Sequence, residues 1–170
     1  MSQIHKNNFK EKLHRFAPII LLFISVLNEI DFNDLGIKYF SFNFAYILIF
    51  YFSLKKSGSL GYGLIFIAGL FNDVVIGMPI GISSLLYLLI CGAAAYLRNI
   101  TLRPNLMKDW IYFLVTILII NSISFLILTF IFYYEVNFDD QIVNIIFTFA
   151  LYLFFTYLFN TFEKFMVGKN

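Results

Sequence analysis

Long runs of apolar residues, separated by short polar segments, make up most of this chain. Several runs approach the roughly 20 residues that a helix needs to cross a bilayer core about 30 Å thick. They lack the alternation of a transmembrane β-strand, and the backbone of a lipid-exposed segment must be satisfied within a helix. The pattern therefore predicts an all-α polytopic membrane protein, a six-transmembrane-helix bundle. The predicted spans cover about residues 16–30, 37–54, 60–76, 80–97, 110–134 and 142–162.

Charged residues divide between alternate polar segments. One set of segments carries eleven bases and three acids, a formal charge of +8, and the other carries one base and seven acids, a charge of −6. Basic segments resist translocation, so the positive set and both termini are expected in the cytoplasm. The acids expected on the outer side are Glu29, Asp31, Asp34, Asp73, Glu135, Asp139 and Asp140.

The composition supports a chain that is solvated by lipid. Hydrophobic residues make up 61% and charged residues 13%, far from the values of soluble domains. Six spans leave no room for a separate soluble domain. We predict a cytoplasmic tail over 1–15, one transmembrane domain over 16–162 and a second cytoplasmic tail over 163–170. The single cysteine, Cys91, lies inside an apolar run, so no internal disulfide is expected.

Asp73 is the one ionisable residue well inside a predicted span. An acid at membrane depth is a candidate for proton or ligand binding, but the spans offer it no ionisable partner. We favour a structural role, in which its carboxylate accepts hydrogen bonds from the free N–H groups that open the fourth span. Gly77 and Gly81 match G-x-x-x-G, but Pro79 between them favours a tight turn over a dimer motif.

Small residues recur at spacings close to one face of the fourth span. Such a face lets two helices approach closely in lipid. Its members are Gly81, Ser84, Cys91 and Ala95, continued by Gly92.

Polar residues recur every four positions in the sixth span. This stripe is expected to face protein and to hydrogen-bond with Asn121 and Ser124 of the fifth span, and a polar ligand cavity is the alternative. Its members are Asn144, Thr148, Tyr152, Thr156 and Asn160.

No catalytic site, metal site or cofactor is predicted. Both histidines, His5 and His14, lie in the N-terminal tail, so the spans can assemble neither a metal cluster nor a Ser-His-Asp arrangement. The glycines of 58–63 precede a membrane helix and lack the order of a phosphate-binding loop. The basic N-terminus is expected to anchor to anionic lipid, and no nucleic-acid partner is predicted.

The stretch GLFNDVVIGMPIG over 69–81 resembles the central signature of the MreD family of bacterial rod shape-determining membrane proteins. The matching positions are Gly69, Asp73, Gly77, Pro79 and Gly81. Chain length and six spans are also similar, although Lys38-Tyr39-Phe40-Ser41 departs from the Pro-Asp that often opens the family's second span. The resemblance implies a non-enzymatic scaffold in the bacterial inner (cytoplasmic) membrane. Its expected partners are the single-span protein MreC, the actin-like MreB, a SEDS glycosyltransferase and a transpeptidase.

A second function is compatible with the same architecture. The six-helix bundle is similar to the S component of a vitamin transporter, a membrane subunit that binds a small molecule in a polar pocket. Candidate pocket residues are Asn28, Glu29, Asn72, Asp73 and the stripe of the sixth span. A channel or proton pathway is disfavoured because no paired ionisable residues are predicted at depth.

The charge division predicts how single cysteines in a Cys91→Ser background will react with a membrane-impermeant thiol reagent. Cysteines at Asn33 and Asn137 should react from outside in intact cells, because both lie in acidic segments. A cysteine at Ser57 should react only after the cytoplasmic side is opened. The reverse accessibility would invert the orientation.

Overall fold

The computed structural model describes residues 16–26, 41–55, 60–101 and 105–167, and regular secondary structure in them is entirely helical. This confirms the predicted all-α class. A first helix covers Phe16–Val26. The following helices are α2 (Phe44–Lys55), α3 (Tyr62–Ile76), α4 (Ile82–Ile100), α5 (Leu106–Leu126), its π-helical continuation η2 (Ile127–Ile131), and α6 (Phe138–Val167).

Three of these helices are long and apolar enough to cross a membrane: Ile82–Ile100, Leu106–Ile131 and Phe138–Phe162. The helices Phe16–Val26, Phe44–Lys55 and Tyr62–Ile76 are apolar but shorter. The chain is therefore a helical membrane-protein bundle, and six complete crossings remain a prediction.

Several helix ends differ from the predicted span boundaries. The fifth helix begins at Leu106, four residues early, because the Asn105 side chain accepts a hydrogen bond from Met107 N (3.0 Å) and caps the helix. Residues 132–137 are not helical, so the predicted end at 134 is too late, and the sixth helix begins at Phe138 instead of 142. Residues 41–43 are not helical either, while 27–30 and 37–40 lie outside the described residues.

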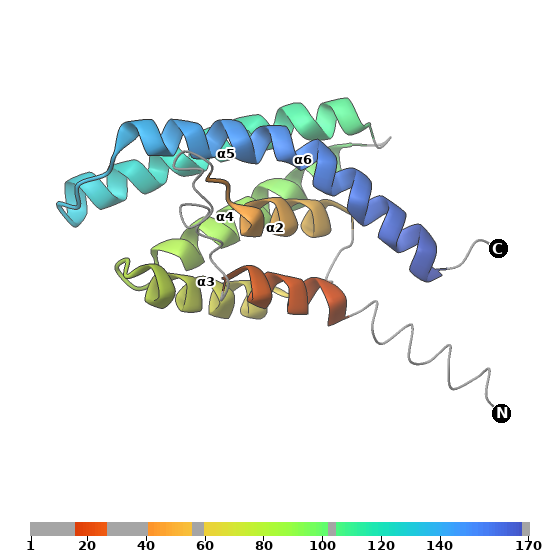
Figure 1. Ribbon diagram of the computed structural model, residues 1–170, viewed down its shortest axis with the longest axis horizontal. Helices are drawn as coiled ribbons and strands as arrows, with labels where there is room; N and C mark the ends of the chain where they lie inside the picture. Colours follow the sequence, from red (N-terminus) through yellow and green to blue (C-terminus); the bar gives the residue numbers. More distant parts are fainter. Residues whose placement is uncertain (1–15, 27–40, 56–59, 102–104, 168–170) are drawn as a thin grey trace.

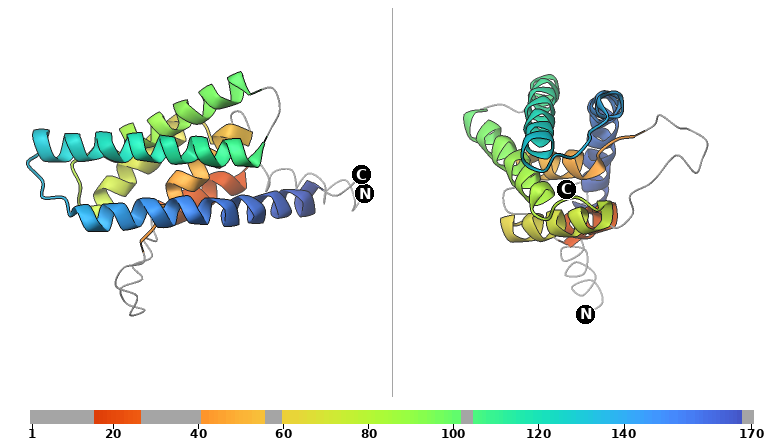
Figure 2. Two further views of the ribbon diagram at one scale, coloured as in Figure 1. Left: turned by 90° about the horizontal axis from the view of Figure 1, so that it is seen from above. Right: turned by 90° about the vertical axis from the view of Figure 1, so that its left-hand side faces the viewer.

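The bundle has two distinct ends. The start of the first helix and the end of α6 lie together at one end, at the right of Figure 1, which we call the termini end. The α3–α4 turn and the connection from η2 to α6 lie at the opposite end, which we call the hairpin end (Figure 1). Figure 2 shows the same arrangement from above, with α5 and α6 running antiparallel along most of the bundle.

Helix α2 forms the centre of the bundle. Every residue from Ala45 to Leu54 is buried, on all sides of the helix. A helix that is apolar all round is buried all round, and the sequence FAYILIFYFSLK has no polar face. In the end-on view of Figure 2, α3, α4, α5 and α6 surround it. This short helix therefore lies in the interior of the bundle, and its closest backbone contacts are with α4 and α6.

Aromatic rings fill the space between α2 and the α5–α6 pair. The Phe50 ring of α2 lies 5.0 Å from that of Phe113 and 5.8 Å from that of Tyr152, centroid to centroid. Phe113 and Tyr152 are themselves stacked at 4.4 Å. The three rings come from three helices and meet in the buried core.

Candidate functional site

The α3–α4 turn depends on two glycines in left-handed conformations. Gly77 ends α3 with φ 76°, and its N–H donates to the Asp73 carbonyl. Gly81 precedes α4 with φ 103°. Side chains rarely adopt such φ values, so glycine is favoured at both positions. The structure confirms the predicted tight turn around Pro79.

The Asp73 carboxylate closes this turn from within α3. Its Oδ2 accepts from Gly81 N at 2.6 Å, and its Oδ1 accepts from Ser83 N at 2.9 Å. Gly81 occupies the N-cap position of α4 but has no side chain that could cap it. Asp73, which is fully buried, supplies the missing cap from the neighbouring helix. The hydrogen bonds predicted for this carboxylate are therefore present.

Two further polar contacts join the same helices. The Asn72 side chain donates through Nδ2 to Ser83 Oγ at 2.9 Å, and Ser84 Oγ donates to the Phe66 carbonyl at 2.8 Å. Asn72, Asp73, Ser83 and Ser84 are all buried. Buried polar groups are stabilising only when they are paired, and these are paired across the helix boundary.

Gly69 sets the distance between α3 and α4. A Cβ atom at this position would lie 2.4 Å from Ser84 Cα and 2.5 Å from Ser84 N. No ordinary side chain fits against a backbone at that distance, so the two helices approach as closely as their main chains allow. The signature positions Gly69, Asp73, Gly77, Pro79 and Gly81 thus belong to one compact structure, which we call the α3–α4 hairpin.

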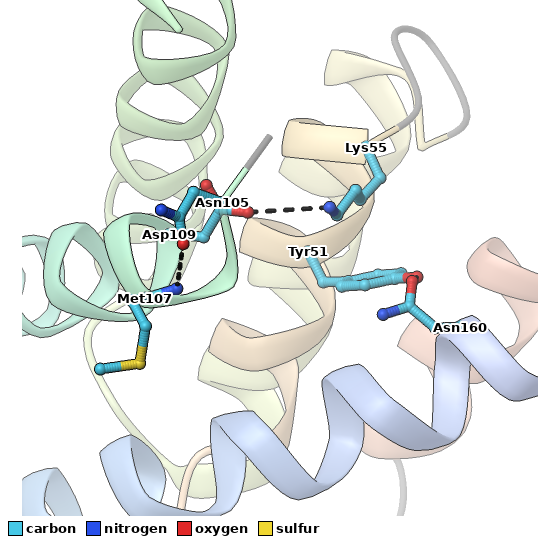
Figure 3. Close-up of polar contacts among 6 residues, drawn as sticks. All are labelled: Tyr51, Lys55, Asn105, Met107, Asp109 and Asn160. Carbon is cyan, nitrogen blue, oxygen red and sulfur yellow. Dashed lines mark hydrogen bonds and ion pairs between the residues drawn. The ribbon is translucent and has the colours of Figure 1, made fainter. Parts of the chain in front are cut away.

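A second polar cluster lies at the termini end, where three helices meet. Lys55 at the end of α2 pairs with Asp109 in the first turn of α5, with 3.7 Å between Nζ and Oδ2 (Figure 3). Arg98 in the last turn of α4 donates to the Ser53 carbonyl at 2.7 Å, a favourable place for a cation near the end of α2. Asp109 was not predicted as a site residue, because in the sequence it is one of the charges that flank the fifth span. Its helix-initiating position after Asn105 was the available signal.

The polar stripe of α6 faces protein, as predicted, but its partners were predicted wrongly. Thr148, Tyr152 and Thr156 are buried. Asn144 donates to Ser41 Oγ at 2.8 Å, and Thr148 Oγ1 accepts from Asn43 N at 2.9 Å, so the stripe meets the chain before α2. Farther along α6, Asn160 accepts from the Tyr51 hydroxyl at 2.8 Å (Figure 3).

The two residues of α5 predicted to pair with this stripe bond elsewhere. Asn121 Nδ2 donates to the Ile117 carbonyl at 2.8 Å, within its own helix, and the Asn121 carbonyl accepts from Gln141 at 3.2 Å. Ser124 is buried and has no hydrogen bond to the stripe within the described residues. A four-residue period identifies one helix face, but it does not identify the neighbouring helix.

The small-residue face of α4 serves two different neighbours. Ser84 lies against α3, whereas Cys91 accepts a hydrogen bond from Ser53 Oγ of α2 at 3.2 Å. Ala95 is half-buried, and Ala94 is the fully buried alanine. Gly92 is exposed, with open space where its Cβ would be, so its predicted place on this face is wrong. It lies about 100° around the helix from Cys91.

The chain matches the family described as rod shape-determining protein MreD over residues 10–162, nearly the whole chain. The chain belongs to the MreD family. The match confirms the resemblance drawn from residues 69–81, and it identifies a membrane protein of rod-shape determination. No curated protein and no solved structure matches the chain. Among the described residues of this MreD-family chain, no group of three or more potential metal ligands occurs.

Gly69→Ala should destabilise the protein by about 1–3 kcal/mol, because the added methyl group meets the Ser84 backbone. Gly92→Ala is the matched control in an exposed part of α4, where helix propensity favours alanine by roughly 0.5–1 kcal/mol. Thermal unfolding of the purified variants in one detergent measures both effects. Equal melting temperatures for the two variants would contradict the close approach.

Asp73→Leu should destabilise the protein by at least about 1–3 kcal/mol, because two N–H groups lose their acceptor. Asp73→Asn retains one acceptor oxygen and should lose less. Asp139→Asn, an exposed acid at the hairpin end, serves as the control and should change little. Unfolding measurements that rank the three variants otherwise would refute the capping role of Asp73.

Proposed function

We propose that this MreD-family chain is a non-enzymatic integral membrane scaffold of the bacterial cell-elongation machinery, which directs peptidoglycan synthesis in rod-shaped cells. The family match over residues 10–162 is the observation that carries the proposal. The distribution of polar groups in the bundle supports it. The polar groups at the α3–α4 hairpin form hydrogen bonds that hold one helix against the other.

We place the scaffold in the inner (cytoplasmic) membrane with both termini in the cytoplasm. The charge division between segments supports this orientation. The bundle geometry agrees with an even number of crossings, since the start of the first helix and the end of α6 lie at the same end (Figure 1). In this orientation the α3–α4 hairpin faces outward, and the Lys55–Asp109 pair lies near the cytoplasmic surface.

The proposed partner is an MreC-like single-span membrane protein, through which the scaffold joins the actin-like MreB, the glycosyltransferase and the transpeptidase. Small and polar residues are the usual contacts between helices in lipid. Ser84, Cys91, Thr148 and Tyr152 are buried within the chain itself and cannot contact a partner in the closed bundle. A partner must therefore use faces that remain exposed.

The exposed face of α5 is the one we propose for this contact. It consists of Val115, Leu118, Ile119, Ser122 and Leu126. Ser122 is a small polar residue about 20 Å along α5 from Asp109, and its hydroxyl donates to the Leu118 carbonyl at 2.8 Å. A small side chain between larger ones leaves room for a second helix to approach.

Depletion of the protein from its host should round the cells, and co-purification should recover the single-span partner without added ligand. Ser122→Phe should reduce recovery several-fold and fail to restore rod shape, because the ring obstructs the α5 face. Val74→Phe, on the exposed face of α3, is the matched control and should behave as the wild type.

The same experiment separates the scaffold from the alternative function. Unchanged cell shape on depletion, together with tight binding of a vitamin-like molecule by the purified protein, would replace the scaffold with a transporter subunit. Rounded cells with equal partner recovery for Ser122→Phe and wild type would retain the scaffold and reject the α5 contact.

A further inference from the structure

Two hydroxyl groups on α6 are buried without hydrogen-bond partners. Tyr152 is 0% exposed and Thr156 is 2% exposed. Neither the Tyr152 Oη atom nor the Thr156 Oγ1 atom has a partner at hydrogen-bonding geometry among the described residues. The two residues lie one turn apart on the same face of the helix. A buried hydroxyl that loses water without gaining a partner costs about 1–3 kcal/mol. A bound molecule that hydrogen-bonds to both hydroxyls would remove this cost.

The same part of the bundle holds an incompletely paired carboxylate. The Tyr152 ring stacks on Phe113 of α5, and one turn from Phe113 toward the termini end is Asp109, on the same buried face of α5. Asp109 is 3% exposed, yet Lys55 Nζ stays 3.7 Å from its Oδ2. A charge-assisted hydrogen bond is about 2.7–2.9 Å long. Asp109 therefore retains acceptor capacity.

These polar groups are neighbours. The Thr156 hydroxyl is a close neighbour of the Tyr152 hydroxyl, although the two do not have hydrogen-bonding geometry, and the Asp109 charge also acts on the Tyr152 hydroxyl. Asp109 comes from α5, Tyr152 and Thr156 come from α6, and Lys55 comes from α2. Three helices thus direct polar atoms toward one buried region, next to the aromatic rings that fill the core.

We propose that this region binds a water molecule that bridges the Tyr152 hydroxyl, the Thr156 hydroxyl and the Asp109 carboxylate. Water can accept a hydrogen bond from a hydroxyl and donate one to a carboxylate at the same time, and buried waters typically make about three such bonds. Lys55 already supplies a positive charge to Asp109, which disfavours a metal cation, and the carboxylate disfavours an anion. Lys55 exposes 25% of its side chain, which gives the region a route for exchange.

The bound water would connect α5 to α6 where the protein makes no direct hydrogen bond between Asp109 and the buried hydroxyls. A direct contact between the same two helices lies next to it. Trp110, the residue after Asp109, donates through Nε1 to the Phe149 carbonyl at 3.0 Å. This inference concerns the bundle itself and does not depend on the proposed function.

Solid-state NMR with polarisation transfer from water tests the proposal directly, on the full chain in lipid with ¹³Cζ-labelled tyrosine. The Tyr152 signal, assigned by its loss in Tyr152→Phe, should gain intensity from water, and Thr156→Val should reduce that gain. Tyr133, which is 87% exposed, provides the positive reference. A Tyr152 signal without transfer, in a sample where Tyr133 shows it, would overturn the proposal.

Thermal unfolding provides an independent test. Tyr152→Phe and Thr156→Val should each lower the melting temperature by about 2–6 °C, and the double variant should lose less than the sum. Thr129→Val is the matched control, since its buried hydroxyl also lacks a partner but lies in η2, at the other end of α5. It should be neutral or stabilising. Neutral or stabilising effects of all three substitutions would mean that the α6 hydroxyls are unpaired.

Discussion

The cap that Asp73 places on α4 is the interaction on which the α3–α4 hairpin depends. Gly81 must be glycine because of its left-handed backbone, and a glycine cannot cap the helix it precedes. The acceptor therefore comes from the helix before the turn, and its two hydrogen bonds fix the end of α3 against the start of α4. Gly69 then allows the helix backbones to meet at Ser84. The left-handed backbone at Gly81 thus explains why the acidic side chain of Asp73 is buried at the turn.

The central helix explains why the polar groups lie at the helix ends. Helix α2 spans about 18 Å and is buried on every side, so its flanks are packed by aromatic and aliphatic side chains. Asn43, the residue before its first turn, meets the α6 stripe at Thr148, and its last turn meets Arg98 and Asp109 through Ser53 and Lys55. Backbone groups at helix ends lack internal partners, and these contacts supply them.

Composition and motif were sufficient to predict the helical class and the geometry around Asp73, because lipid permits few backbone structures and because the Gly-Pro-Gly turn acts over a few residues. Contacts between distant segments were not predictable in this way. The period of Asn144 and Thr148 identified a buried face, yet its neighbour is Ser41 and Asn43, about one hundred positions away. In the sequence Asp109 is one of the charges that flank the fifth span, and only the fold places it beside Lys55.

The unequal helix lengths have a consequence for the surrounding lipid. Helix α3 has 15 residues, about 22 Å, whereas Leu106–Ile131 has 26 residues, about 39 Å. A bilayer of uniform thickness cannot match both at the same tilt. If α3 crosses the membrane, as predicted, the lipid must thin beside α3 or α5 must tilt strongly, and either response costs fractions of a kcal/mol per ångström of mismatch. The protein would therefore have a thin flank and a thick flank, and a gradient of bilayer thickness would orient the molecule within the membrane plane.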